Sequence, residues 1–207
     1  LADDPGLFVE DFCRWAEIDE IGKVALRSGV ARTAAELMDS PTARLYHDHI
    51  LVKEPGTEAA TPWHQDQPYY NVHGRGISAW IPVDRVPKVG SPEFWAGSHL
   101  GPWRLPRSFL EREAKWFPEG TLAEVPDIDA DRSLYDIRRW ELDPGDVVFF
   151  DFATVHSAPG NPTEHRRRVP TLRPPGADAR FAPRPWTTSP EVPGLTRELA
   201  ARAEPEH

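Results

Sequence analysis

The chain has 207 residues, with 24 lysines and arginines against 33 aspartates and glutamates, and a formal net charge of −9. This length predicts a single domain, residues 1–207. The acidic balance, without a basic block, argues against a nucleic-acid partner. No apolar stretch approaches the length that spans a membrane, and the single cysteine excludes an internal disulfide framework. We therefore expect a cytoplasmic protein.

The N-terminal part, residues 1–42, is predicted to consist of helices, with the helical pattern covering 7–39. Phe8, Phe12 and Trp15 recur at helical spacing, and Thr33 to Glu36 has the pattern of a capping box. We expect these helices to pack on the outside of a sheet.

Residues 43–183 are predicted to form the core of the domain from short strands. Between 45 and 53 the alternation places His47, His49, Leu51 and Lys53 on one face. Further strands are predicted near 61–70, 77–83, 92–96, 136–142, 147–152, 167–173 and 178–182. No helical pattern separates most of them, and 23 prolines argue against a helical bundle. The pattern therefore favours a mainly β fold of antiparallel strands.

Two segments depart from this rhythm. Residues 101–135 read as a long insertion with one helix near 107–116, and residues 184–207 as a tail that wraps the surface with a short helix at 195–203. Long irregular segments in small domains are usually functional or disordered. The insertion is expected either to cover a substrate site or to be an ordered loop packed on the helices.

The triplet His64-Gln65-Asp66 is the main candidate site. On an extended segment the first and third residues point the same way, so His64 and Asp66 converge while Gln65 faces away. His156 follows the apolar run 146–152 and could supply a third ligand from another strand. Two histidines and one carboxylate are the ligands of non-heme Fe(II) oxygenases. The alternative is an ordinary surface or hydrogen-bonded pair, since the chain has eight histidines.

A set of motifs then occurs in a specific order: Trp63–Asp66, Trp80–Asp84, Ala96–His99, Pro144–Asp146, and His156 with Asn161 and Arg167. Over residues 45–173 this combination resembles the phytanoyl-CoA dioxygenase family of Fe(II)- and 2-oxoglutarate-dependent oxygenases. The resemblance implies a double-stranded β-helix (a cupin-like jelly roll) with flanking helices and iron held at one mouth. Family members usually carry additional N-terminal helical sequence. We expect this chain, which starts at Leu1, to lack it.

The resemblance also implies a reaction. Fe(II) held by His64, Asp66 and His156 would use 2-oxoglutarate and O2 as co-substrates, hydroxylate a C–H bond of a small molecule, and release succinate and CO2. Related halogenases have a small residue in place of the carboxylate. A carboxylate at Asp66 therefore favours hydroxylation.

In this family an arginine eleven positions after the distal histidine binds the far carboxylate of 2-oxoglutarate, and here that position is Arg167. Its planar fork suits a carboxylate. Strand alternation puts Arg166 and Arg168 on the opposite face, and a register shifted by one residue would transfer the role to them. Pro170 departs from the expected strand, because proline cannot donate to a ladder.

Two further residues are candidates for oxo-acid contacts. Trp80 resembles a family tryptophan near the oxo acid, or it is a core aromatic. His47 lies on the strand where relatives place a polar contact. Lys53 is expected to be exposed more often than to reach the site, and Asn161 is expected to order the loop after His156.

Two other functions remain open. One is a metal-dependent jelly-roll oxygenase or isomerase that does not use 2-oxoglutarate, and the other is a non-catalytic relative that binds a small molecule. An inward-facing Arg167 near the metal would favour the oxo acid. The family name does not imply a CoA thioester, and the acidic chain makes a polyanionic CoA ester a less favoured substrate.

Overall fold

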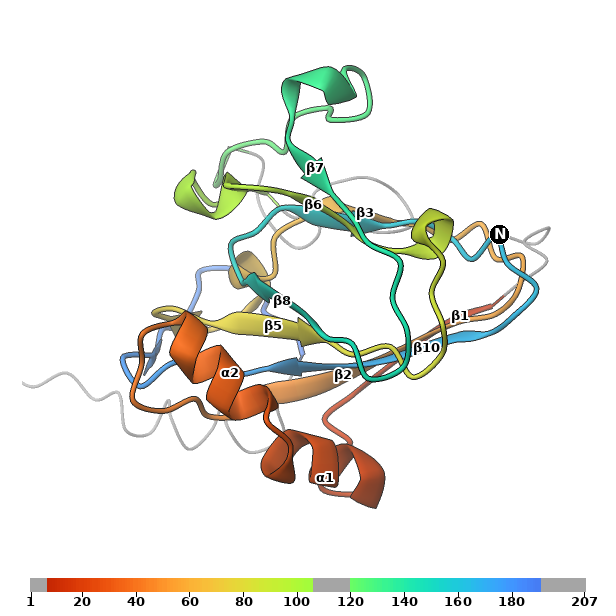
Figure 1. Ribbon diagram of the computed structural model, residues 1–207. Coiled ribbons are helices and arrows are strands. Elements are labelled where there is room, and N and C mark those ends of the chain that lie inside the picture. The colour runs from red at the N-terminus through yellow and green to blue at the C-terminus, as the bar shows by residue number, and fades with distance from the viewer. Residues whose placement is uncertain (1–6, 106–119, 191–207) are drawn as a thin grey trace, which may run out of the picture.

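Two antiparallel β-sheets face each other in the computed structural model, which describes residues 7–105 and 120–190 (Figure 1). The larger sheet has the strand order β1 (Phe8–Phe12), β2 (His47–Lys53), β10 (Arg167–Arg173), β5 (Ile77–Trp80) and β8 (Val148–Asp151). The smaller has the order β3 (Thr61–His64), β9 (His156–Ala158), β6 (Glu93–Trp95) and β7 (Ile137–Arg138). A separate pair joins β4 (Val72–His73) and β11 (Arg180–Phe181). The mainly β fold expected from the sequence is confirmed.

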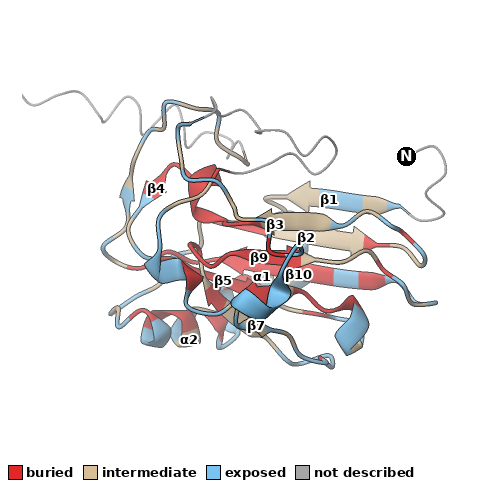
Figure 2. Ribbon diagram, turned by 90° about the horizontal axis from the view of Figure 1, so that it is seen from above, coloured by how far each residue is buried: buried red, intermediate tan, exposed pale blue. Residues whose placement is uncertain are grey.

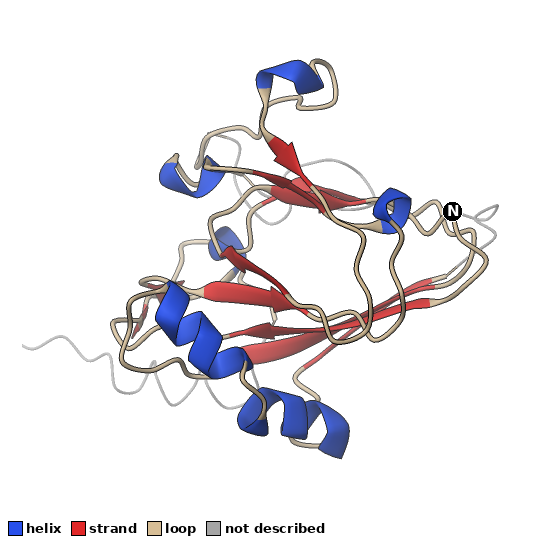
Figure 3. Cartoon of the chain, in the orientation of Figure 1, coloured by secondary structure: helices blue, strands red, loops and turns tan. Residues whose placement is uncertain are grey.

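The core lies between the two sheets, which Figure 3 shows as two layers of strands. Its buried cluster is Trp80, Val86, Phe94, Leu142, Phe150 and Val169. Phe94 from β6 meets Phe150 from β8 at a centroid distance of 4.9 Å, so the cluster joins the sheets directly. Burial of each large apolar side chain contributes about 1.5–3 kcal/mol to stability.

Helices α1 (Asp19–Arg27) and α2 (Val30–Leu37) cover the outer face of the larger sheet (Figure 1). Ala25 and Val30 pack with Ala79 and Leu172 of the sheet. In Figure 2 the buried residues concentrate on β5, β9 and β10, while the helices are exposed on their outer sides. No helix in the described ranges is long and apolar enough to cross a membrane.

The predicted helix over residues 7–39 is wrong at its start. Residues 8–12 form β1, which pairs with β2 from Phe8 opposite Lys53 to Phe12 opposite His49. The buried carboxylate of Asp48 then accepts the backbone N–H groups of Arg14 and Trp15 and turns the chain away from the sheet. Pairing with a distant strand has overridden the local spacing.

The predicted capping box is also wrong. The residue preceding α2 is Gly29, and Thr33 lies within the helix.

Some strands end earlier than the sequence pattern predicts, because the chain turns there. The predicted strand 61–70 ends at His64, and a 3-10 turn, η1 (Gln67–Tyr69), follows with Pro68 inside it. Further 3-10 turns are η2 (Lys88–Gly90), η3 (Ser98–Leu100) and η4 (Arg132–Leu134). The helices predicted near 107–116 and 195–203 lie outside the described residues.

Strand β10 coincides with the predicted strand 167–173, including Pro170. The carbonyl of Pro170 accepts the N–H of Ile81, just after β5 ends at Trp80. The amide and carbonyl of one residue in an antiparallel strand face the same side. The missing N–H therefore faces a segment beyond β5, and the ladder between β10 and β2 is kept.

Candidate metal centre and cavity

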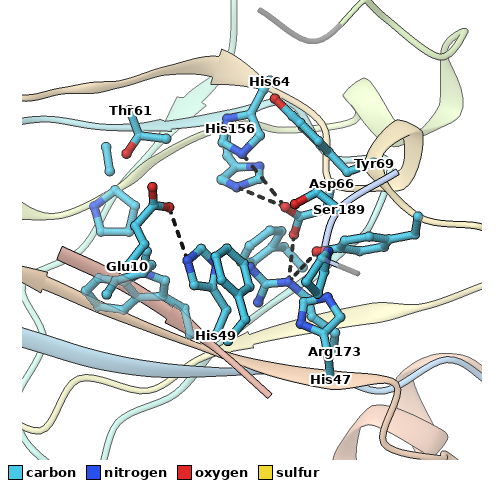
Figure 4. Close-up of a pocket in the computed structure, with 18 residues that line it drawn as sticks. Glu10, His47, His49, Thr61, His64, Asp66, Tyr69, His156, Arg173 and Ser189 are labelled. Carbon is cyan, nitrogen blue, oxygen red and sulfur yellow. Dashed lines mark hydrogen bonds and ion pairs between the residues drawn. The ribbon is translucent and has the colours of Figure 1, made fainter. Parts of the chain in front are cut away.

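His64, Asp66 and His156 converge at one mouth of the space between the sheets (Figure 4). His64 ends β3, His156 begins β9, and the two residues are register partners. Their ligand atoms and that of Asp66 all lie within 4.8 Å of one another, and all three residues are buried. Asp66 Oδ1 is 3.8 Å from His64 Nε2 and 4.0 Å from His156 Nε2.

Both imidazoles are oriented by backbone carbonyls. Nδ1 of His64 contacts the Pro62 carbonyl at 2.8 Å, and Nδ1 of His156 contacts the Thr154 carbonyl at 3.0 Å. These contacts assign the proton to Nδ1 and leave Nε2 as the ligand atom. Burial lowers the pKa of His156 to about 3, and it also lowers the pKa of His64. Both rings are therefore neutral at physiological pH, as metal ligation requires.

The carboxylate of Asp66 is fixed by its second oxygen. Oδ2 accepts a hydrogen bond from Ser78 Oγ at 2.5 Å and lies 3.2 Å from Arg173 Nε, which leaves Oδ1 facing the two histidines. Burial alone would raise the pKa of Asp66, but the charge of Arg173, then those of the histidines, outweigh burial and lower it. Asp66 is therefore ionised at neutral pH.

Gln65 faces away from the metal centre, as the strand pattern predicted. Its side chain is fully buried and donates to the Ala153 carbonyl at 2.6 Å, while its oxygen accepts the N–H of Arg104 at 2.7 Å. Gln65 thus ties the ligand segment both to the loop before His156 and to the start of the 101–135 insertion.

A cavity of about 320 Å³ lies beside the three ligands. Its walls are mostly apolar and aromatic, with polar side chains at both ends. The lining residues are Glu10, Phe12, His47, His49, Leu51, Thr61, His64, Asp66, Tyr69, Tyr70, Trp80, Pro92, Phe150, His156, Ala158, Arg173, Ser189 and Pro190. This size and composition are typical of a small-molecule site.

Arg167 faces the space between the sheets but does not line the cavity. Its side chain is buried, and its guanidinium donates to the carbonyls of Gly90 and Pro159. Pro92 and Ala158, which are close in sequence to those two acceptors, do line the cavity. Arg166 and Arg168 point outward, to Glu54 and Asp84. The predicted alternation of the three arginines is therefore confirmed, and Arg167 contacts backbone segments next to two residues that line the cavity.

Lys53 lies beside Arg167, and the expectation that it is exposed is wrong. It is 1% exposed, and Nζ donates to the Pro159 carbonyl at 2.8 Å, the same carbonyl that Arg167 contacts. Burial, followed by the charge of Arg167, lowers the pKa of Lys53 to about 7. Burial also lowers the pKa of Arg167 to about 10. Neither cation has an ion-pair partner among the described residues. This pair of cations suits an anion.

The burial of Lys53 predicts a pH-dependent stability. Its folded pKa of about 7 lies below the value of about 10.4 for an exposed lysine, so the folded chain binds fewer protons between these values. The free energy of unfolding of the metal-free chain is therefore expected to rise with pH over this window, by up to about 1.4 kcal/mol per unit from Lys53. Urea unfolding at several pH values is expected to show this rise in the parent chain and a smaller one in Lys53→Met. Equal slopes would contradict it.

Trp80 and His47 both line the cavity. Trp80 is also part of the core, so both roles considered for it from the sequence are compatible with its position. His47 lies edge-on to Tyr70, directly opposite Arg173 in the pairing of β2 with β10. An oxo-acid contact by either residue stays a prediction. Asn161 donates to the Lys53 and His165 carbonyls, and so orders the loop after β9.

Two polar residues of the cavity, Arg173 and Glu10, were not found from the sequence, whereas His49 was expected on the strand face that it shares with His47. Arg173 contacts Asp66, and its place was readable from the alternation of the predicted strand 167–173. Glu10 Oε1 lies 3.1 Å from His49 Nε2 on the opposite side of the cavity (Figure 4). The ring of Phe12 stacks on that of His49. Glu10 was missed because residues 8–12 were predicted to be helical.

The described part of the insertion stays off the cavity, whereas the tail reaches it. None of the described residues of 101–135 lines the cavity. Trp63 instead contacts Asp129 through Nε1, on the exposed side of β3. Ser189 of the tail donates its N–H to the Tyr69 carbonyl and lines the mouth, which was not expected of a segment that wraps the surface.

The donor set fits a redox-active divalent metal. Metal–ligand distances near 2.1 Å let one ion bridge atoms up to about 4.2 Å apart, and both nitrogen-to-Oδ1 distances are below that value. Three protein ligands leave positions for other groups, as in non-heme iron oxygenases. The described residues contain no other cluster of this kind.

The sequence profile of the phytanoyl-CoA dioxygenase family (PhyH) matches residues 6–169. The chain belongs to this family. The family resemblance seen in the ordered motifs is therefore confirmed. A probable phytanoyl-CoA dioxygenase of Caenorhabditis elegans is 26% identical over 181 residues, which cover 82% of this chain and 50% of the relative. The chain thus spans about half the length of that curated relative.

Solved structures show the same fold. The epimerase SnoN in complex with Fe3+, alpha ketoglutarate and nogalamycin RO superposes with a TM-score of 0.71 at 22% identity, covering 91% of this chain and 71% of that one. EvdO2 from Micromonospora carbonacea var. aurantiaca, complexed with 2-oxoglutarate, gives 0.64 at 25% identity, covering 88% and 74%. The carbocyclase SnoK from nogalamycin biosynthesis gives 0.66 at 24% identity, covering 95% and 70%. These likenesses confirm the expected jelly roll.

Proposed function

We propose that the chain is an Fe(II)- and 2-oxoglutarate-dependent dioxygenase that hydroxylates a C–H bond of a small molecule and releases succinate and CO2. The observation that carries this proposal is the convergence of His64 Nε2, His156 Nε2 and Asp66 Oδ1 at one buried point. Iron held by these three residues together with 2-oxoglutarate would supply the means to oxidise the substrate with O2.

The residues around the ligands would prepare the site for that chemistry. The Pro62 and Thr154 carbonyls hold the imidazole tautomers, while Ser78 and Arg173 hold the carboxylate oxygen that faces away from the histidines. Such outer partners fix ligand orientation and tune the metal. The apolar walls, including Trp80 and Phe150, would exclude water from the reaction.

The two buried cations Arg167 and Lys53 support the use of a dicarboxylate. An oxo acid that chelates the metal has a second carboxylate to place, and Arg167 with Lys53 would provide a paired positive site for it. A carboxylate there would replace backbone carbonyls as the acceptor of charge-assisted hydrogen bonds. SnoN and EvdO2, which share the fold, have been solved with an oxo acid bound.

Hydroxylation is the outcome that the ligand set favours. Asp66 occupies the position where halogenating relatives have a small residue, so no position is opened for a halide. SnoK is a carbocyclase and SnoN an epimerase. Ring closure would replace hydroxylation if the oxidised substrate lost a second hydrogen, and epimerisation would replace it if a stereocentre were inverted.

A metal-dependent oxygenase or isomerase without the oxo acid is the second candidate. It is favoured by one observation: Arg167 is separated from the cavity and already bonded to the Gly90 and Pro159 carbonyls. Under this alternative, product would form from substrate without consumption of 2-oxoglutarate.

A succinate-formation screen tests the proposal. The chain with Fe(II), 2-oxoglutarate and O2 is incubated with a panel of small molecules, and succinate and substrate-derived products are measured by mass spectrometry. We expect succinate only with fitting substrates and none in His64→Ala. An 18O2 label in the product distinguishes hydroxylation from ring closure or epimerisation. Product without succinate would support the second candidate.

A further inference from the structure

The cavity wall beside Asp66 carries two buried polar atoms that the metal centre does not use. Within residues 7–105 and 120–190, neither His47 Nε2 nor Arg173 Nη1 has a hydrogen-bond partner. His47 is 2% and Arg173 4% exposed, and both line the cavity. Buried polar groups in folded proteins are normally paired, so two unpaired ones at a cavity point to a ligand.

The two atoms belong to one place. His47 and Arg173 are register partners in the pairing of β2 with β10. Side chains directly opposite in an antiparallel pair have Cβ atoms about 4.5–5.5 Å apart and share a face. Figure 4 shows both side chains on the same side of the cavity as Asp66, with Glu10 on the other side.

The hydrogen-bonding roles of the two atoms differ. Nδ1 of His47 contacts the Asp48 carbonyl at 3.2 Å, which assigns the ring proton to Nδ1 and makes Nε2 an acceptor. Burial, then the charge of Arg173, lowers the pKa of His47 to about 3, so the ring stays neutral. Arg173 uses Nε for Tyr70 and Asp66, and its Nη1 can only donate.

His47 Nε2 as acceptor and Arg173 Nη1 as donor together favour a ligand group that can both donate and accept a hydrogen bond. A hydroxyl donates its proton to Nε2 and accepts from Nη1 with the same oxygen. An ionised carboxylate or an ether has no proton for Nε2, and an ammonium group has no acceptor for Nη1. His49 Nε2, on the same face of β2, also has no hydrogen bond of good geometry among the described residues, but a carboxylate oxygen of Glu10 already lies 3.1 Å from it.

We propose that the prime substrate is an alcohol or phenol whose hydroxyl is held between His47 and Arg173, beside the metal centre. This assignment rests on the proposed function and names its substrate class. The apolar walls formed by Phe12, Trp80 and Phe150 suit a ring that carries the hydroxyl. His47 then contacts the substrate and not the oxo acid. The guanidinium of Arg173 would then contact the substrate hydroxyl through Nη1 and the metal-ligating residue Asp66 through Nε.

Binding of small fluorinated probes tests the assignment without turnover. The affinities of 4-fluorophenol, 4-fluoroanisole and 4-fluorotoluene for the Zn(II)-loaded 207-residue chain are measured by 19F NMR titration. 4-Fluorophenol is expected to bind about tenfold more tightly than the other two probes, in line with one satisfied buried pair. Equal affinities, or no binding of 4-fluorophenol at millimolar concentrations, would overturn the proposal.

Three variants separate this role from a structural one. His47→Phe keeps an aromatic ring against Tyr70 but removes the acceptor, so the preference for the phenol is expected to vanish. His47→Gln keeps an acceptor oxygen and is expected to retain it. His73→Phe, at an exposed position of β4 outside the cavity, is the control and is expected to leave the preference unchanged. Circular dichroism verifies folding, and a preference that survives in folded His47→Phe would sink the idea.

Added 2-oxoglutarate separates this proposal from the oxo-acid site. At saturating concentration it is expected to leave the affinity for 4-fluorophenol unchanged or improved. Competition between the two would assign His47 and Arg173 to the oxo acid and overturn the proposal. Failure of the succinate screen would instead count against the proposed function, because the probe preference does not depend on 2-oxoglutarate.

Discussion

Replacement of Asp66 by alanine is expected to abolish metal retention and to destabilise the metal-free chain by about 3–5 kcal/mol. Metal retention is lost because Asp66 Oδ1 faces both histidines. Stability is lost because the Arg173 side chain, 5% exposed, keeps its charge but loses its only carboxylate partner among the described residues. Breaking one half of a buried ion pair costs this much. Metal content after dialysis and urea unfolding of the metal-free chain measure the two effects.

His64→Ala is the matched comparison. It is also expected to lose the metal, but with a smaller change in the free energy of unfolding, because His64 borders an existing cavity and leaves no charge unpaired. The double variant Asp66→Ala/Arg173→Met is expected to recover most of the lost stability and still bind no metal. If either Asp66→Ala or His64→Ala held iron as tightly as the parent, the ligand assignment would be wrong.

The metal centre was predictable because two of its ligands are encoded locally. A strand has a period of two, so His64 and Asp66 face one way whatever the rest of the fold does. The third ligand, His156, needed the apolar run that ends just before it and the family resemblance. Its pairing with His64 is a long-range contact that no local pattern contains.

The far wall of the cavity was not predictable in the same way. Phe8 and Phe12 have helical spacing, but β1 exists because β2 offers an edge for it to pair with. An edge strand is determined by its neighbour more than by its own sequence. Because β1 was not predicted, Glu10 and Phe12 were not recognised as candidate site residues.

Arg167 and Arg173, at the two ends of β10, could be predicted only in part. The predicted alternation already put Arg167 and Arg173 on one face, so the position of Arg173 was available from the sequence. What it contacts was not, since that depends on where Asp66 and Tyr70 arrive. The burial of Lys53 depended likewise on a carbonyl 106 positions away.

Arg167→Ala is expected to weaken 2-oxoglutarate binding by about 30- to 5,000-fold while Fe(II) still binds. The proposed contact is a charge-assisted pair in a buried site, and its truncation costs on the order of 2–5 kcal/mol. Lys53 remains in the variant, but as a single cation whose pKa lies near neutrality. The measurement is an anaerobic titration of the Fe(II)-loaded chain with 2-oxoglutarate, followed by the visible charge-transfer band of the chelate.

Arg166→Ala and Arg168→Ala are the matched controls, because they remove the same charge from the neighbouring positions. Their side chains are exposed and pair with Glu54 and Asp84, so the dissociation constant for 2-oxoglutarate is expected to stay within about twofold of the parent value. Retained Fe(II) binding in Arg167→Ala separates a lost oxo-acid contact from a damaged metal centre. An unchanged 2-oxoglutarate affinity in Arg167→Ala would remove Arg167 from the oxo-acid site. If the affinity for 2-oxoglutarate were unchanged in Arg167→Ala and in both controls, a residue that lines the cavity would have to bind the oxo acid. Arg173 is the other buried arginine on that face of β10, and it lines the cavity.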